Sequence, residues 1–177
     1  MRDLSEAQRW YQHTLELTDE QDTLNRARIM GQLGNLAHER FYDARDAGVG
    51  REQLATVFMD SVRAYLDVLD LLPPEAIDEL AVTHHQLAII FSDIRDLSHA
   101  LPHYQKAIQY RERQDNYYGA ARVRFNAARA LEDVGRNHDA LLYARAALND
   151  YETIGPATVA EADQVRKFIT ALNRKIG

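Results

Sequence analysis

The chain has 177 residues, the length of one domain or one short repeat array, and its 46% hydrophobic content supplies a core and excludes intrinsic disorder. The absence of cysteine excludes disulfides, thiolate metal sites and cysteine nucleophiles, and no apolar run approaches the roughly 18 residues of a membrane span. The formal charge is −6, and residues 1–100 hold nine basic and 18 acidic side chains, which argues against a general nucleic-acid binder.

Helical periodicity predicts an all-α chain of about eight helices, separated by the few glycines and prolines. An unpaired opening helix is expected at 5–20, and its charged start is unlike a secretory signal, so a cytoplasmic protein is expected. A pair of long helices follows at 24–72, turning at Gly48–Gly50 and ending before Pro73.

Two later segments repeat each other. HHQLAIIFSDIRDLSHALPHYQKAI (84–108) and RFNAARALEDVGRNHDALLYARAAL (124–148) superpose without a gap at an offset of 40 residues. Each predicts a helix, a short turn and a second helix, giving hairpin repeats at 78–114 and 118–152. Small residues such as Ala100 and Ala140 stand where two helices must approach closely.

The small–large pattern, with Ala100 opening the second helix, Tyr104 four residues later and Ala107 three residues after that, resembles the tetratricopeptide repeat (TPR). The 40-residue spacing is similar to the long-helix variety found in bacterial regulators and in sensor arms of signalling proteins. The resemblance implies a right-handed α-solenoid of helix hairpins spanning 1–177 as a single domain. It also implies a concave groove, lined by the first helix of each pair, that binds a protein or peptide.

The two ends of the array differ. The segment 157–176 carries one apolar stripe and one polar face, as expected of a terminal capping helix. The opening helix carries Trp10 and Tyr11, and three interpretations stay open: it caps the array, it belongs to a longer chain, or its apolar edge meets a partner, including a second copy of the chain.

The sequence predicts no enzyme and no cofactor. It has no Glu-x-x-His, no His-Glu-x-x-His, no Gly-rich phosphate loop and no Gly-x-Ser-x-Gly turn. His99 and His103 lie four residues apart on one helix, a spacing that permits a soft cation, but solvent-exposed helix positions are the simpler interpretation.

Steps of four, three and four residues along each first helix define one candidate partner-binding face. Side-chain amides recur along this face and can pair with a peptide backbone. Carboxylates also recur at equivalent positions, at Glu39, Asp93 and Asp133, and would favour a ligand that is basic along that edge. His85, next to Gln86, would add pH sensitivity. The candidate binding residues are Arg28, Gln32, Asn35, Glu39, His85, Gln86, Asp93, Arg122, Asn126, Arg129 and Asp133.

The expected function is therefore a non-catalytic scaffold that binds a peptide segment in this groove. A helix- or domain-sized partner in the same groove is a second hypothesis. A structural or oligomerisation module, or a sensor arm of a larger signalling assembly, is the alternative from another class. Neither nucleic acid nor a membrane is expected as a partner.

Overall fold

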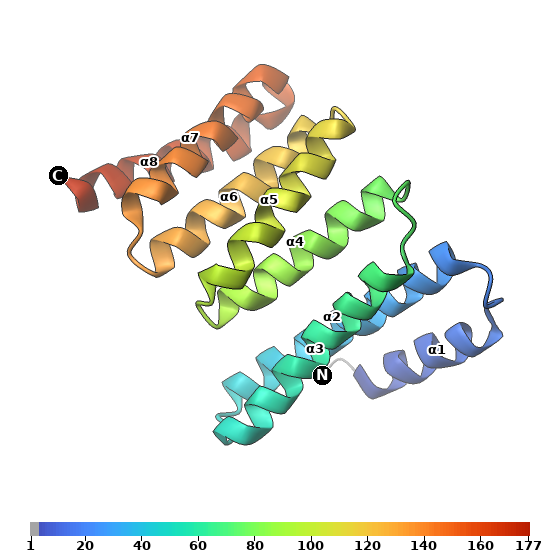
Figure 1. Cartoon of the computed structure of the whole chain (residues 1–177). Helices are drawn as coiled ribbons and strands as arrows, with labels where there is room; N and C mark the ends of the chain where they lie inside the picture. Colours follow the sequence, from blue (N-terminus) through green and yellow to red (C-terminus); the bar gives the residue numbers. More distant parts are fainter. Residues whose placement is uncertain (1–3) are drawn as a thin grey trace. The chain divides into compact units, whose positions relative to one another are not determined.

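The all-α prediction is confirmed. The computed structural model describes residues 4–177, and this range contains eight α-helices and one 3₁₀ turn with no strand (Figure 1). The elements are α1 (Leu4–Leu17), α2 (Thr23–Asp46), α3 (Arg51–Leu71), α4 (Ile77–Asp93), α5 (Leu97–Arg113), α6 (Tyr117–Asp133), α7 (Asn137–Ile154), η1 (Pro156–Thr158) and α8 (Val159–Ile176). None of the helices in residues 4–177 combines the length and the apolar character that crossing a bilayer requires.

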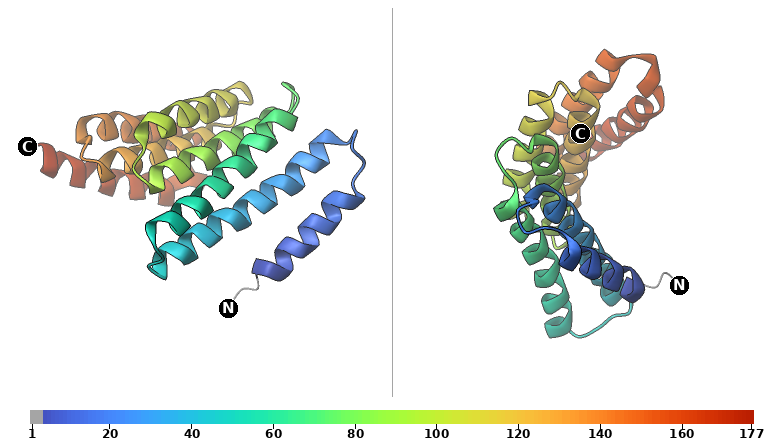
Figure 2. Two further views of the ribbon diagram at one scale, coloured as in Figure 1. Left: turned by 60° about the horizontal axis from the view of Figure 1, so that its bottom comes forward. Right: turned by 90° about the vertical axis from the view of Figure 1, so that its right-hand side faces the viewer.

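The helices form two compact units, the first ending at Ile90 and the second running from Phe91 to Gly177. The first unit holds α1, α2, α3 and most of α4, and the second holds the last turn of α4 and the helices α5 to α8. Within the first unit α1 packs on α2, and α2 and α3 form a long hairpin (Figure 2).

A helix-interior glycine sets the approach of α2 to α3. An added Cβ at Gly34 would lie 3.0 Å from ring atoms of Tyr65 on α3, so the absence of a side chain at Gly34 lets this ring lie against the α2 backbone without displacement. Farther along the hairpin, Phe41 and Phe58 meet edge to face with 5.8 Å between ring centroids. Both Phe41 and Tyr65 are 2% exposed, and they anchor the core of the hairpin.

In the second unit three helices begin 20 residues apart: α5 at Leu97, α6 at Tyr117 and α7 at Asn137. Arg95, Asp115 and Gly135 have positive φ values of 62°, 52° and 79°, and each ends a helix in a left-handed turn. The residue after each turn donates its N–H to a carbonyl five positions earlier, and Asp96 and Asn116 then cap the next helix with their side chains. Two such helices make the 40-residue offset seen in the sequence.

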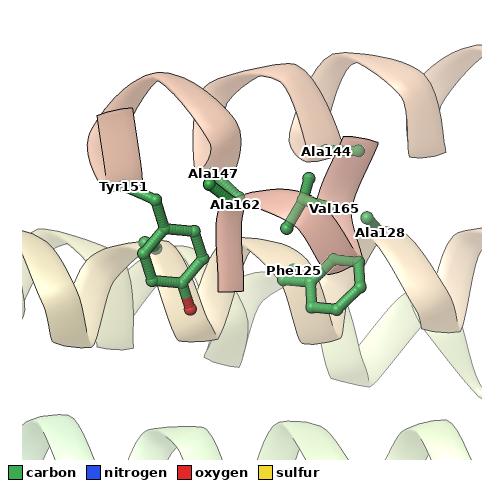
Figure 3. Close-up of a cluster of buried hydrophobic side chains, with 8 residues drawn as sticks. Phe125, Ala128, Ala144, Ala147, Tyr151, Ala162 and Val165 are labelled. Atoms are coloured by element: carbon green, nitrogen blue, oxygen red, sulfur yellow. The ribbon is translucent and has the colours of Figure 1, made fainter. Parts of the chain in front are cut away.

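The alignment of the two repeats correctly predicts the core. Ala100, Ala107, Ala140 and Ala147 are all fully buried, and Tyr104 is 2% exposed. In the later hairpin Ala144 and Ala147 pack with Phe125, Tyr151 and Val165 into one apolar cluster between α6, α7 and α8 (Figure 3).

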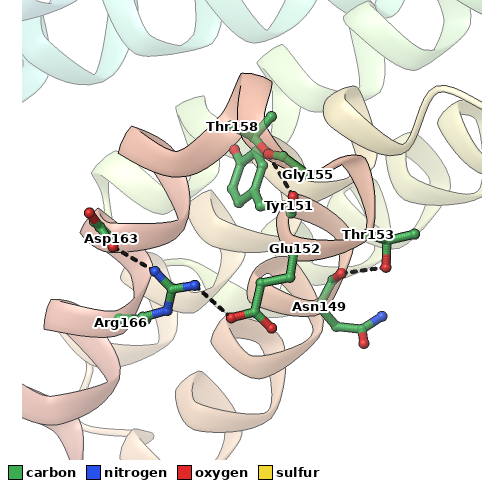
Figure 4. A network of polar contacts seen from close by, with 8 residues as sticks. All are labelled: Asn149, Tyr151, Glu152, Thr153, Gly155, Thr158, Asp163 and Arg166. Atoms are coloured by element: carbon green, nitrogen blue, oxygen red, sulfur yellow. Dashed lines mark hydrogen bonds and ion pairs between the residues drawn. The ribbon is translucent and has the colours of Figure 1, made fainter.

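The predicted apolar stripe of the last helix is confirmed. Ala162, Val165 and Leu172 are buried, and the Phe168 ring meets the Phe125 ring edge to face, with 5.3 Å between ring centroids. The polar face of α8 adds ion pairs, since Arg166 contacts Asp163 at 2.5 Å and reaches Glu152 of α7 at 2.8 Å (Figure 4). Because these groups are exposed, the packing of the stripe holds α8 in place more than the ion pairs do.

Candidate functional site

The first unit contains a solvent-accessible pocket of about 250 Å³ between α2, α3 and α4. Its lining residues are Ala27, Arg28, Gly31, Gln32, Asn35, Tyr65, Val68, Asp78, Glu79, Val82, Thr83 and Gln86. They come from three helices, and all of them precede Ile90, so the first unit forms this pocket by itself.

Part of the lining is apolar. Ala27 and Val68 are buried, while Val82 is 41% exposed although it is aliphatic. Gly31 contributes no side chain, and nothing lies within 4 Å of the position that a Cβ there would occupy. The missing side chain on α2 therefore leaves open space in a pocket whose lining is partly apolar.

A line of polar groups runs beside this apolar part. The Tyr65 hydroxyl donates a hydrogen bond of 2.6 Å to Oδ1 of Asn35, and Nδ2 of Asn35 lies 3.5 Å from Oε1 of Gln32. Burial raises the pKa of Tyr65 well above its ordinary value of 10, so this hydroxyl remains a donor. Within residues 4–177, the Gln86 side chain and the Gln32 NH₂ group have no hydrogen-bond partner, and both can pair with a ligand.

An ion pair lies at another part of the lining. Arg28 donates to Glu79 from Nε at 2.9 Å and from Nη2 at 2.6 Å, and both bonds end on the same oxygen, Oε1. The Arg28 side chain is 57% exposed and that of Glu79 is 18% exposed. The carboxylate is therefore the more deeply placed of the two charges.

Four predicted binding residues line this pocket together: Arg28, Gln32, Asn35 and Gln86. Glu39 lies farther along α2 on an exposed position, and His85 is half-buried beside Gln86, but neither lines the pocket. The geometry thus brings together Gln32 and Gln86, two of the amides that recur along the predicted binding face. Another amide of that face, Asn126, belongs to the second unit, and its role stays a prediction.

The second unit groups other predicted residues around a buried tyrosine. Ser92 donates to the Tyr104 hydroxyl at 3.2 Å. Burial raises the pKa of Tyr104 to about 12, with Asp93 and Asp133 also raising it and Arg129 lowering it. These three predicted residues are therefore close enough to act on one hydroxyl.

Two predicted residues of α6 remain beside this group. Arg122 is exposed and lowers the pKa of Tyr151, against the larger effect of burial, which raises it. Asn126 is half-buried.

The two histidines with metal-ligand spacing pack on an aromatic ring. His99 and His103 both stack on Phe91, with centroids 5.0 and 5.9 Å away, and Nδ1 of His99 lies 2.7 Å from a carboxylate oxygen of Asp96. Among residues 4–177, no group of three or more His, Cys, Asp or Glu side chains is placed to hold a metal ion.

Sequence reasoning missed the residues that give the pocket its shape. Tyr65 and Val68 of α3 and Glu79 of α4 line the pocket, but all three fell outside the chosen stripe. One signal was present, because Gly31 and Gly34 are two glycines within a single helical segment. Glycines inside a helix mark close backbone approach or a functional reason, and here Gly34 does the first and Gly31 opens the pocket.

Comparison with known proteins gives a fold likeness. No family model and no curated protein matches the sequence. A solved structure, described as the crystal structure of BtubC (BKLC) from P. vanneervenii, superposes with a TM-score of 0.78 at 18% sequence identity. The match covers 98% of this chain and 66% of that one, so the chain spans about two thirds of its length. At this identity the likeness shows a common helical fold.

Proposed function

We propose that the chain is a non-catalytic scaffold that binds a peptide segment or protein partner on the exposed faces of its first helices. The observation that carries this proposal is the first-unit pocket, which unites Arg28, Gln32, Asn35 and Gln86 with an apolar lining. Amides with unused donors beside an apolar space suit a peptide, because its backbone needs hydrogen bonds and its side chains need burial.

The wider architecture in this proposal is a right-handed α-solenoid of TPR-like hairpins, closed by α8 as a capping helix. The 20-residue recurrence of helix, left-handed turn and capping residue supports a repeat. The buried apolar stripe and exposed polar face of α8 support the cap.

The size of the pocket favours a side chain over a cofactor. Sites for drug-sized ligands span roughly 300–1,000 Å³, whereas this one has about 250 Å³. A pocket of this volume accommodates one large side chain of an extended partner, and the rest of the partner would lie along the neighbouring helix faces.

The proposal is tested by affinity capture with the wild type and with a variant carrying Gln32→Ala and Gln86→Ala. Captured proteins are identified by mass spectrometry, and circular dichroism checks that the helix content is unchanged. Gln32 is exposed and Gln86 is half-buried, and replacing such surface amides should change stability by less than about 0.5 kcal/mol each. A control variant carries Gln53→Ala and Gln105→Ala, two exposed glutamines outside the pocket.

The expected result is a partner that the wild type and the control retain and the Gln32/Gln86 variant loses. A partner that all three proteins retain would contradict the proposed site. A wild type that retains no more than an unrelated helical protein does would contradict the scaffold function itself.

The outer face of α1 favours self-association as a second candidate function. Trp10 is 65% exposed and Leu17 is 75% exposed, and large apolar side chains on one helix commonly mark a contact. Sedimentation at several protein concentrations tests this, with Trp10→Gln as the variant. A concentration-dependent mass that Trp10→Gln abolishes would support association through α1, and an invariant monomer mass would contradict it.

A further inference from the structure

We infer that the first-unit pocket selects a basic peptide segment: an apolar anchor side chain enters beside Gly31, and a neighbouring lysine or arginine of the peptide binds Glu79. This inference rests on the proposed scaffold function and adds the chemistry of the partner. It follows from the unused bonding capacity of Glu79, from the space at Gly31 and from the charge of the first unit.

Glu79 has a free acceptor. Both hydrogen bonds from Arg28 end on Oε1, and Oε2 has no partner within residues 4–177. No fully buried side-chain oxygen or nitrogen in that range lacks a hydrogen bond, so this oxygen remains accessible to solvent. A carboxylate accepts several hydrogen bonds, and a peptide ammonium or guanidinium can bind Oε2 while Arg28 stays on Oε1.

The same ion pair disfavours an acidic partner. Arg28 already gives two of its donors to Glu79, and Asp78 adds a second carboxylate to the lining. With one cation against two anions, the pocket lining attracts positive charge.

The first unit as a whole is negatively charged, as the pocket lining is. Residues 1–90 contain eight basic and 16 acidic side chains, whereas residues 91–177 contain 13 basic and 11 acidic ones. An acidic field of this size speeds the arrival of a basic segment and slows that of an acidic one, and added salt reduces the effect.

The apolar half of the ligand follows from Gly31. The position of its missing Cβ is open space, and Gly31 lines the same pocket as the aliphatic side chains of Ala27, Val68 and Val82. An apolar anchor gains from burial there in proportion to its area, and the amides of Gln32 and Gln86 can pair with the adjacent backbone.

The inference is tested by selecting binders from a displayed library of random 12-residue peptides on the full wild-type chain. The enriched peptides are synthesised with a fluorescent label, and their dissociation constants are measured by anisotropy at low and high salt. Four proteins are compared with the wild type: Gly31→Leu fills the open space, Glu79→Gln removes the charge, Arg28→Gln removes the competing cation, and Gln53→Ala is the control. Circular dichroism confirms that all are equally helical.

The expected peptides carry an apolar residue with a lysine or arginine nearby. Gly31→Leu should abolish binding, and Glu79→Gln should weaken it about tenfold, the effect of one lost charge-assisted hydrogen bond. Arg28→Gln should leave binding unchanged or strengthen it up to about threefold, because the peptide cation no longer shares the carboxylate. High salt should weaken binding to the wild type more than binding to Glu79→Gln.

The failures are distinguishable. One outcome is that Gly31→Leu abolishes binding while the peptides lack basic residues, or while Glu79→Gln binds like the wild type. In either case the selectivity for basic peptides is wrong, but the first-unit pocket is still a peptide site. If Arg28→Gln weakens binding more than about fivefold, the partner is acidic and the inference is overturned. If no peptide is enriched, or all variants bind equally, both the inference and the pocket as a peptide site are overturned.

Discussion

Replacing each of the two α2 glycines with alanine should change stability in opposite directions. Gly31 and Gly34 are three residues apart in the same helix, so both substitutions remove the same backbone entropy penalty. Alanine inside a helix is more favourable than glycine by about 0.5–1 kcal/mol. Only the surroundings of the new methyl group differ between the two sites.

At Gly31 the new Cβ has nothing within 4 Å, and Gly31→Ala should raise the free energy of unfolding by about 0.5–1 kcal/mol. At Gly34 the new Cβ would lie 3.0 Å from Cε2 and Cζ of Tyr65. That ring is buried and its hydroxyl is held by Asn35, so it cannot move aside cheaply. Overpacking costs roughly 1–3 kcal/mol, and Gly34→Ala should therefore lose about 1 kcal/mol net.

Urea unfolding followed by circular dichroism measures both effects, with the slope of each transition checked for equality. The expected result is a higher midpoint for Gly31→Ala and a lower one for Gly34→Ala. Two midpoints shifted in the same direction would refute the assignment of Gly34 to the α2–α3 contact and of Gly31 to the open pocket.

Three further predictions concern the second unit. Ala100→Leu and Ala140→Leu should each destabilise by about 1–3 kcal/mol in thermal melts, because both alanines are fully buried, and unchanged melting would show that the repeat register is wrong. Arg95 has φ 62°, a left-handed backbone conformation that costs energy for any residue except glycine, so Arg95→Gly should stabilise the protein by about 1 kcal/mol. Gly135 has φ 79°, and Gly135→Ala should destabilise the protein by a similar amount. Urea midpoints that shift in the same direction for both variants would contradict this. Burial lowers the pKa of His103 below its ordinary value of 6.5, and the nearby His99 lowers it further. The unfolded chain therefore takes up this proton first as the pH falls below 6.5, and stability is lost from there down to the folded pKa. The advantage of the wild type over His103→Gln in urea should shrink between pH 8 and 5, and a constant difference would contradict the shift.

Much of the fold was predictable because its information is local. Pro73 and the glycines of the turns separate the helices, and the gapless offset of 40 residues between 84–108 and 124–148 identifies the core alanines. The buried Ala100 and Ala140 occupy equivalent positions for this reason. The first helix pair lacks this regularity, and only its long helices and its turn could be placed.

The site was predictable in part. Counting along α2 and α4 selected Gln32 and Gln86, since residues three and four apart share a helix face, and both line the first-unit pocket. The contact of Arg28 with Glu79 joins residues 51 positions apart and depends on how two helices pack, which a single helix pattern does not specify. For the same reason, the hydrogen bond between Tyr65 and Asn35, which lie 30 positions apart, was not expected.

The most direct test of the scaffold account is a nuclear magnetic resonance titration of the ¹⁵N-labelled chain with an enriched peptide. The side-chain NH₂ signals of Gln32 and Gln86 and the backbone N–H of Gly31 are observed, with Gln53 as the internal reference. The account predicts saturable shifts of the first three signals and none of the fourth. Shifts confined to the outer face of α1, or to α7 and α8, would contradict it.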